Sequence, residues 1–161
     1  MKAMNWAILL LGTVSSSVVL GDPPKQVDDY QWAAGTWKCK GQASDPPHPF
    51  TATFTLTREM EGAAYVEKWV EDKSAQHTQP YSVTYLWTYD PKSNMYVRNG
   101  VDNSANRIAQ SSSGWQNGVW TWETDGFRIP VTRDGTKRFH VMAELRKDGN
   151  WVKFAEAGCD K

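Results

Sequence analysis

The sequence lacks an excess of charge of one sign, and beyond its first 21 residues it lacks a long apolar run. Among its 161 residues, eighteen Lys and Arg balance eighteen Asp and Glu, so the formal net charge is zero. Nucleic acids and anionic membrane surfaces attract proteins with a basic field, which is missing here. A membrane-spanning helix needs about 20 apolar residues, and the mature chain has no such stretch. We therefore expect neither nucleic-acid binding nor membrane insertion of the mature chain.

Residues that build metal and catalytic sites are also scarce. The three histidines are scattered: His48 and His77 fall in polar loops, and His140 falls in a strand pattern. This arrangement matches no zinc-binding spacing, and the chain has no histidine near its C-terminus that could act as an axial haem ligand. A GxSxG nucleophile elbow and a glycine-rich phosphate loop are both missing. We therefore expect no metal and no cofactor, and we assign no catalytic residue.

Only two cysteines occur, Cys39 and Cys159, and neither belongs to a CxxC motif. Residues 1–21 combine an early Lys2 with an apolar run and small residues, which is typical of a secretory signal peptide. A permanent membrane anchor is the alternative. An exported chain meets an oxidising compartment, where two such cysteines can form a disulfide. We expect a secreted or periplasmic protein with a Cys39–Cys159 disulfide, and two buried thiols are the alternative.

Aromatic residues are abundant, with nine Trp, six Tyr and five Phe. Large flat side chains suit strands and the walls of ligand sites better than helical bundles. Apolar residues alternate with polar ones in FTATFTLT from residue 50, in YSVTYLWTYD from residue 81 and in KRFHVMAEL from residue 137. Turn signals such as NG and DG separate these runs. The pattern predicts antiparallel hairpins.

We expect a linker over residues 22–30, a short helix over 28–34 and one barrel domain over 31–161. Strands are predicted at 36–43, 50–60, 64–71, 81–89, 95–101, 107–116, 119–124, 127–132, 137–146 and 151–158. A meander of ten strands exposes two edges unless the first strand, with Cys39, pairs with the last, with Cys159. The predicted fold is all-β: a closed antiparallel up-and-down barrel of about ten strands. A two-sheet sandwich is the alternative.

Several segments resemble known barrels. GTWKCKG at residues 35–41 resembles the GxW signature that opens the first strand of lipocalins and related calycin barrels. By that resemblance Trp37 plugs the barrel base, with Arg138 or Arg146 as its stacking partner. TYDPKSNMYVRNGVDN at 88–103, WTWE at 120–123 and KDGNWVKFAEAGCDK at 147–161 are similar to a family of uncharacterised bacterial secreted proteins. That resemblance implies an exported lipocalin-like barrel over residues 31–161.

A barrel of this size has room for a ligand cavity lined by the inward face of each strand. Our candidates for the ligand-binding wall are Phe54, Trp69, Tyr85, Trp87 and Trp122. The leading hypothesis is a barrel that binds a small apolar or amphiphilic molecule, with the polar loop 72–80 at its portal. One alternative is a barrel enzyme, a hydrolase or isomerase, that uses Glu67, Glu71 or His140. The other is a structural or protein-interaction module whose core is filled.

Overall fold

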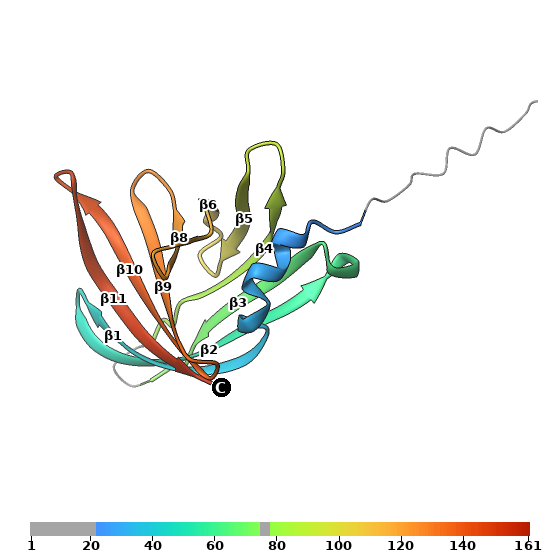
Figure 1. The fold of residues 1–161 in the computed structure, drawn as a ribbon. Helices are drawn as coiled ribbons and strands as arrows, with labels where there is room; N and C mark the ends of the chain where they lie inside the picture. Colours follow the sequence, from blue (N-terminus) through green and yellow to red (C-terminus); the bar gives the residue numbers. More distant parts are fainter. Residues whose placement is uncertain (1–21, 75–77) are drawn as a thin grey trace, which may run out of the picture.

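The computed structural model describes residues 22–74 and 78–161, so the predicted signal peptide and residues 75–77 of the predicted portal loop lie outside it. The described chain consists of antiparallel strands and two short 3-10 helices (Figure 1). In order, the elements are η1 (Lys25–Ala33), β1 (Gly35–Ser44), β2 (Pro47–Glu59), η2 (Met60–Gly62), β3 (Ala64–Glu71), β4 (Ser82–Asp90), β5 (Met95–Asp102), β6 (Arg107–Ser112), β7 (Trp115–Gln116), β8 (Val119–Glu123), β9 (Phe127–Asp134), β10 (Arg138–Lys147) and β11 (Asn150–Asp160).

Ten of these strands form a closed ring. The strand order is β6-β5-β4-β3-β2-β1-β11-β10-β9-β8, and a further β6–β8 pairing joins the two ends. The two-residue β7 pairs only with β8 within the described chain. Closure removes the exposed edges that an open meander would leave. The predicted closed barrel is therefore confirmed, and the sandwich alternative is wrong.

The ring is held differently at its two non-consecutive seams. Between β1 and β11 the register runs unbroken from Lys38↔Asp160 to Ala43↔Ala155. The predicted disulfide lies within this seam, where Cys39 and Cys159 are paired residues with Cα atoms 4.0 Å apart. Between β6 and β8 only Ser111 and Glu123 pair. The seam between the terminal strands is therefore wide and cross-linked, whereas the β6–β8 seam is narrow.

The predicted strand 107–116 is divided in the structure. Gly114 has a φ of +81°, a conformation that breaks a strand and that glycine adopts without steric cost. A Cβ atom at this position would lie 3.0 Å from the Tyr96 ring. The Ser112 hydroxyl accepts a hydrogen bond from the Gly114 amide at 3.1 Å. The chain therefore leaves the sheet after Ser112 and rejoins it as β7.

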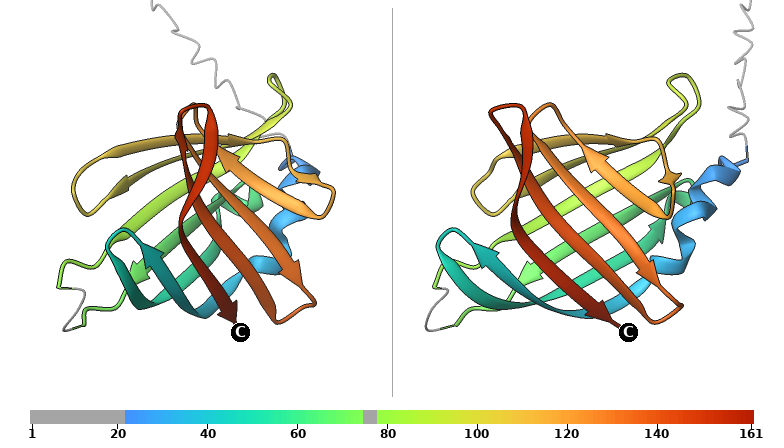
Figure 2. Two further views of the ribbon diagram at one scale, coloured as in Figure 1. Left: turned by 90° about the vertical axis from the view of Figure 1, so that its left-hand side faces the viewer. Right: turned by 60° about the vertical axis from the view of Figure 1, so that its left-hand side comes forward.

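The helix η1 begins at Lys25, earlier than the predicted residue 28 and inside the predicted linker. Pro24 is its N-cap, and the Val27 amide donates to the Pro24 carbonyl at 3.0 Å. A proline is tolerated there because the first amides of a helix have no partner within it. Val27, Tyr30 and Ala33 are buried. In the right-hand view of Figure 2, η1 (blue) lies at the end of the barrel opposite the β1–β2 and β10–β11 hairpins.

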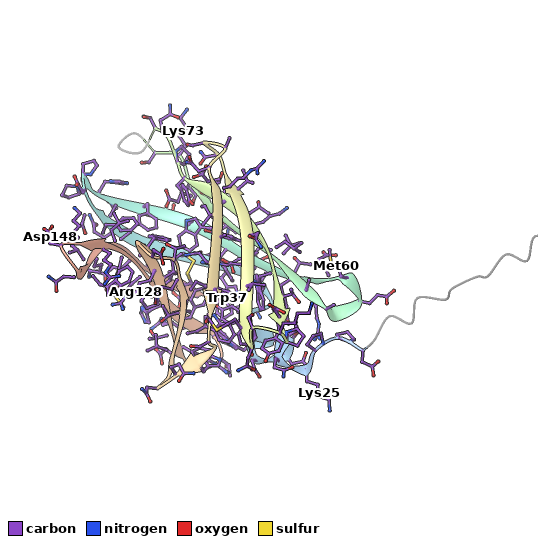
Figure 3. The ribbon with its side chains drawn as sticks, turned by 90° about the horizontal axis from the view of Figure 1, so that it is seen from above. Lys25, Trp37, Met60, Lys73, Arg128 and Asp148 are labelled. Carbon is purple, nitrogen blue, oxygen red and sulfur yellow. A yellow bond between two sulfur atoms is a disulfide. The ribbon has the colours of Figure 1, made fainter. Side chains whose placement is uncertain are left out.

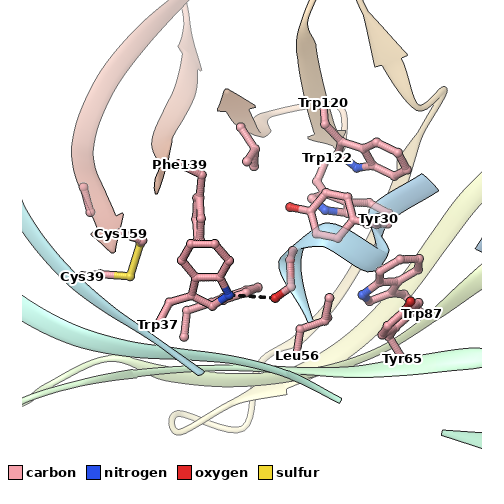
Figure 4. Close-up of a cluster of buried hydrophobic side chains, with 14 of the residues drawn as sticks. Tyr30, Trp37, Cys39, Leu56, Tyr65, Trp87, Trp120, Trp122, Phe139 and Cys159 are labelled. Carbon is pink, nitrogen blue, oxygen red and sulfur yellow. Dashed lines mark hydrogen bonds between the residues drawn. A yellow bond between two sulfur atoms is a disulfide. The ribbon is translucent and has the colours of Figure 1, made fainter. Parts of the chain in front are cut away.

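Aromatic side chains fill the end of the barrel that η1 covers (Figure 4). Trp37 is fully buried, its indole nitrogen donates to the Ala33 carbonyl at 2.8 Å, and its ring lies 5.0 Å from Phe139. The other end carries the β1–β2 and β10–β11 hairpins: Figure 3 places Lys73 and Asp148 toward it, and Lys25 and Met60 toward the filled end. We call these the hairpin end and the closed end.

Candidate ligand-binding cavity

A cavity of about 770 Å³ lies inside the barrel. That volume falls within the range of about 300–1,000 Å³ typical of small-molecule sites. Tyr30, which reaches the interior from η1, contributes to the lining together with Phe139 and Trp122. Tyr30 packs against Trp120 and Trp87 of the closed-end core. The aromatic core therefore forms the floor of the cavity.

The cavity wall is mostly apolar. It comes from inward-facing side chains of strands around the ring: Phe50, Phe54, Trp69, Val83, Ile108, Phe127, Ile129, Val131, Val141 and Phe154. Burying apolar ligand surface against such a wall contributes about 25 cal/mol per Å². The wall can therefore hold a hydrocarbon portion of a ligand without any directed hydrogen bond.

Small residues on three adjacent strands provide the space. Ala43 of β1 pairs with Ala155 of β11, which pairs with Ala143 of β10. All three line the cavity, as does Ala157. Alanine occupies far less interior volume than the aromatic residues that β2 and β3 contribute to the same lining, so this side of the barrel is not filled to the centre. The cavity thus follows from the side-chain sizes.

One buried ion pair lies among these apolar walls. An Arg98 Nη1 nitrogen donates to Glu67 Oε1 at 2.7 Å, and the two side chains are 2% and 9% exposed. Arg98 Nε donates to Gln110 Oε1 at 2.9 Å. Cross-strand pairing places Arg98 of β5 beside Gln110 of β6. We call Glu67, Arg98 and Gln110 the polar cluster.

Two aromatic rings enclose the guanidinium of the polar cluster. The Arg98 Cζ atom lies 4.2 Å from the centroid of Tyr85 and 4.4 Å from that of Trp122. Cation–π contact stabilises a desolvated guanidinium in this arrangement. Gly100, paired with Tyr85, allows the close approach, because a Cβ there would lie 2.5 Å from the tyrosine ring. Arg98 is therefore fixed in position by its hydrogen bonds and by the two aromatic rings that pack on its guanidinium.

Burial is the main cause of the pKa shifts in this region. It raises the pKa of the Glu67 carboxyl, and the neighbouring Arg98 charge opposes that rise. Burial also raises the pKa of Tyr85, which is again partly offset by Arg98. Tyr30 has the same direction of shift, caused first by burial and then by the Glu67 charge. The tyrosine hydroxyls therefore stay neutral donors well above physiological pH.

The candidate ligand-binding residues occupy two depths. Phe54, Trp69, Tyr85 and Trp122 line the cavity. Trp87 does not belong to the lining: it is buried below the floor, stacked on Tyr65 with ring centroids 4.7 Å apart. Contact of these residues with a ligand stays a prediction.

Only two of the three residues of the enzyme alternative meet in one space. Glu67 and Glu71 line the cavity, with Glu71 accepting a hydrogen bond from the Trp69 indole at 3.3 Å. His140 instead lines a separate groove together with Lys40 and Gln42. In the pairing of β10 with β11 it lies beside Gly158. The three side chains therefore cannot act on one substrate.

The cation over the Trp37 ring is Lys161, whose Nζ lies 5.0 Å from the ring centroid and donates to the Ala34 carbonyl at 2.7 Å. The resemblance to lipocalins implied Arg138 or Arg146 at this place. Arg138 is instead an exposed partner of Asp160 at 2.7 Å. Arg146 lies near the hairpin end of β10, where its amide donates to the Gly126 carbonyl. The implied arginine stacking is therefore wrong, although the basic partner itself exists.

Sequence reasoning missed Arg98, Gln110 and Tyr30. Arg98 shares its strand face with the buried Tyr96, so alternation indicates an inward side chain. Charged residues in strands usually face solvent, and this general tendency conceals the exception. Nothing in the local pattern around Gln110 or Tyr30 marks either as a cavity residue.

Neither the models of known protein families nor the curated proteins match this chain. Its likeness to lipocalin-type proteins is therefore confirmed only as a closed antiparallel barrel. In the described part of the chain, no three His, Cys, Asp or Glu side chains group in a way that could hold a metal ion. None of the helices of residues 22–74 and 78–161 has the length and apolarity to cross a membrane.

Proposed function

We propose that this barrel binds one small amphiphilic molecule inside its cavity, in an oxidising compartment outside the cytoplasm. The observation that carries the proposal is the cavity of about 770 Å³ with a mostly apolar wall and a buried polar cluster at its edge. Hydrophobic walls with a few oriented polar groups are the usual composition of small-molecule sites. The Cys39–Cys159 disulfide supports the oxidising compartment, because such bonds persist mainly in exported proteins.

A first experiment identifies the natural ligand. The protein is expressed with its leader, purified from the exported fraction and extracted with organic solvent, and the extract is examined by mass spectrometry. A co-purified molecule with a hydrocarbon portion is expected at close to one equivalent.

A second experiment tests the cavity as the binding place. In the Ala43→Trp variant, an indole enters the cavity from β1 and should abolish binding of N-phenyl-1-naphthylamine, a neutral apolar dye whose fluorescence rises in apolar sites. The matched control is Gln42→Trp, because Gln42 is the adjacent residue and is exposed on the opposite face of β1. Equal dye binding by both folded variants would refute the proposal, as would failure of the wild type to bind.

A further inference from the structure

The polar cluster has more hydrogen-bond donors than acceptors. Arg98 Nη2 and Gln110 Nε2 are buried and have no hydrogen-bond partner among the described residues. The same holds for Nε1 of Trp122, whose ring packs on Arg98. Among the described residues, every buried polar side-chain atom that lacks a hydrogen-bond partner is a nitrogen donor, and none is an oxygen. A buried donor without an acceptor is destabilising, because it has lost its hydrogen bonds to water. A ligand that brings an acceptor oxygen would remove that destabilisation.

The free donors are fixed in place. Arg98 Nε already donates to Gln110 Oε1, so the amide oxygen is engaged and the amide nitrogen is the unpartnered end. Tyr85 and Trp122 hold the two faces of the guanidinium. Arg98 and Trp122 both line the cavity, so a molecule bound there is in contact with the edge of the cluster. Gln110 lies outside the lining, so the cluster meets the cavity through Glu67 and Arg98, with Trp122 beside them.

The charge of the cluster is already balanced. Glu67 lies 2.7 Å from Arg98, so the pair has a formal charge of zero. A ligand carboxylate would add an anion beside Glu67 in a poorly solvated space, where like charges repel strongly. An uncharged acceptor, such as a ketone, ester or ether oxygen, would receive the same hydrogen bond without adding charge.

We infer that the polar cluster selects ligands whose polar end is an uncharged hydrogen-bond acceptor and discriminates against carboxylates. The inference rests on the proposed function and specifies the ligand class of that cavity. The acceptor oxygen contacts Arg98 at the floor, and the hydrocarbon portion extends along the apolar wall toward the hairpin end.

The test uses three probes with the same hydrocarbon chain: undecan-2-one, undecanoate and undecane. Each displaces N-phenyl-1-naphthylamine from the full-length exported protein at neutral pH. The wild type should bind the ketone about tenfold more tightly than the alkane, which corresponds to one hydrogen bond to a charged donor. The carboxylate should bind no better than the alkane.

Replacing Glu67 should reverse this preference. Glu67→Gln keeps the size of the side chain but leaves Arg98 as an uncompensated cation, so undecanoate should now bind about tenfold more tightly than undecan-2-one. The matched control is Glu144→Gln. Glu144 pairs with Arg128 at 2.5 Å, and Arg128 lies 4.6 Å from the Trp151 ring, so this trio resembles the cluster but lies outside the cavity lining. The control should keep the wild-type preference.

A second variant covers the case in which Glu67→Gln does not fold. The double variant Glu67→Gln with Arg98→Met removes the guanidinium donor and both charges of the pair, so the tenfold preference for the ketone over the alkane should fall to that of a neutral donor, about threefold or less. Wild-type binding of undecanoate at least as tight as that of the ketone would overturn the inference, and so would a full tenfold ketone preference in the double variant. Failure of all three probes to bind the wild type would instead overturn the proposed function.

Discussion

Trp69 and Trp87 have the same side chain, but they lie at different depths of the barrel. Trp69 is half-buried in the cavity wall, where its indole nitrogen donates to Glu71. Trp87 is fully enclosed between Tyr65, Tyr30 and Trp122 in the closed-end core. The first can exchange contacts with a ligand, whereas the second contributes to packing.

Alanine substitution should separate these two roles. Trp69→Ala is expected to weaken binding of the apolar dye with a small change in melting temperature. Trp87→Ala should lower the free energy of unfolding by about 3–5 kcal/mol, the range for deleting a buried aromatic, while the folded fraction keeps its affinity. Dye titration and urea denaturation of each variant measure the two quantities. Loss of affinity in Trp87→Ala that equals the loss in Trp69→Ala would contradict the assignment.

The buried Tyr30 hydroxyl should make the free energy of unfolding depend on pH in the alkaline range. Burial raises its pKa above the ordinary value of 10.0. In the unfolded chain the group loses its proton near pH 10, whereas in the folded chain it stays protonated. The stabilising contribution is therefore complete below pH 10 and is lost as the pH rises above it.

Above pH 10 the free energy of unfolding should accordingly fall by up to about 1.4 kcal/mol per pH unit for this one group. Urea denaturation at a series of pH values gives the slope, and Tyr30→Phe should reduce it. The variant serves as its own control below pH 10, where the slope should match that of the wild type. An unaltered alkaline slope in the variant would show that Tyr30 is ionised in the folded protein.

Alternation along the sequence predicts which face of a strand a residue occupies, but not its depth in the barrel. Tyr85 and Trp87 share one face of β4, and both are buried. Two residues farther along the strand, the interior changes from cavity to packed core. That boundary is set by η1, which enters one end of the barrel, and no local pattern in β4 reports the position of η1.

Among the elements, the β1–β11 seam carries the covalent bond. The disulfide joins residues separated by 120 positions, so it strongly restricts the unfolded chain. In the chain-entropy model, Cys39→Ala with Cys159→Ala should lower the free energy of unfolding by about 5 kcal/mol. Chemical denaturation of the wild type, its reduced form and the double variant measures this loss. The reduced form should resemble the variant, and a loss below about 1 kcal/mol would contradict the prediction.

Element boundaries were predictable where side-chain alternation was regular. The strands over residues 64–71 and around 81–89 nearly coincide with β3 and β4 because their inward residues are aromatic or aliphatic. The division after Ser112 was not predictable from alternation, since it depends on the backbone conformation at Gly114. The early start of η1 was missed because two prolines favour an extended chain, whereas here Pro24 caps the helix.

At the scale of the whole molecule, closure could be inferred from the two edges that a ten-strand meander would expose, together with the positions of the two cysteines. The cysteines lie on the first and last predicted strands, which indicated that these strands are neighbours, and the register of β1 with β11 confirms it. The sequence argument also placed the strands 107–116 and 119–124 side by side, as consecutive strands of the meander, but it did not predict that the β6–β8 contact is limited to one residue pair. The second seam arises from the chain leaving the sheet between β6 and β7.

The end covered by η1 also holds Lys161, whose ammonium group caps the ring of Trp37. An affinity tag or a surface linker joined at residue 161 would therefore emerge at the closed end, beside the β9–β10 connection. Immobilised through such a linker, the barrel would present its hairpin end to the surrounding solution, so that a small analyte could reach that end in a biosensor measurement.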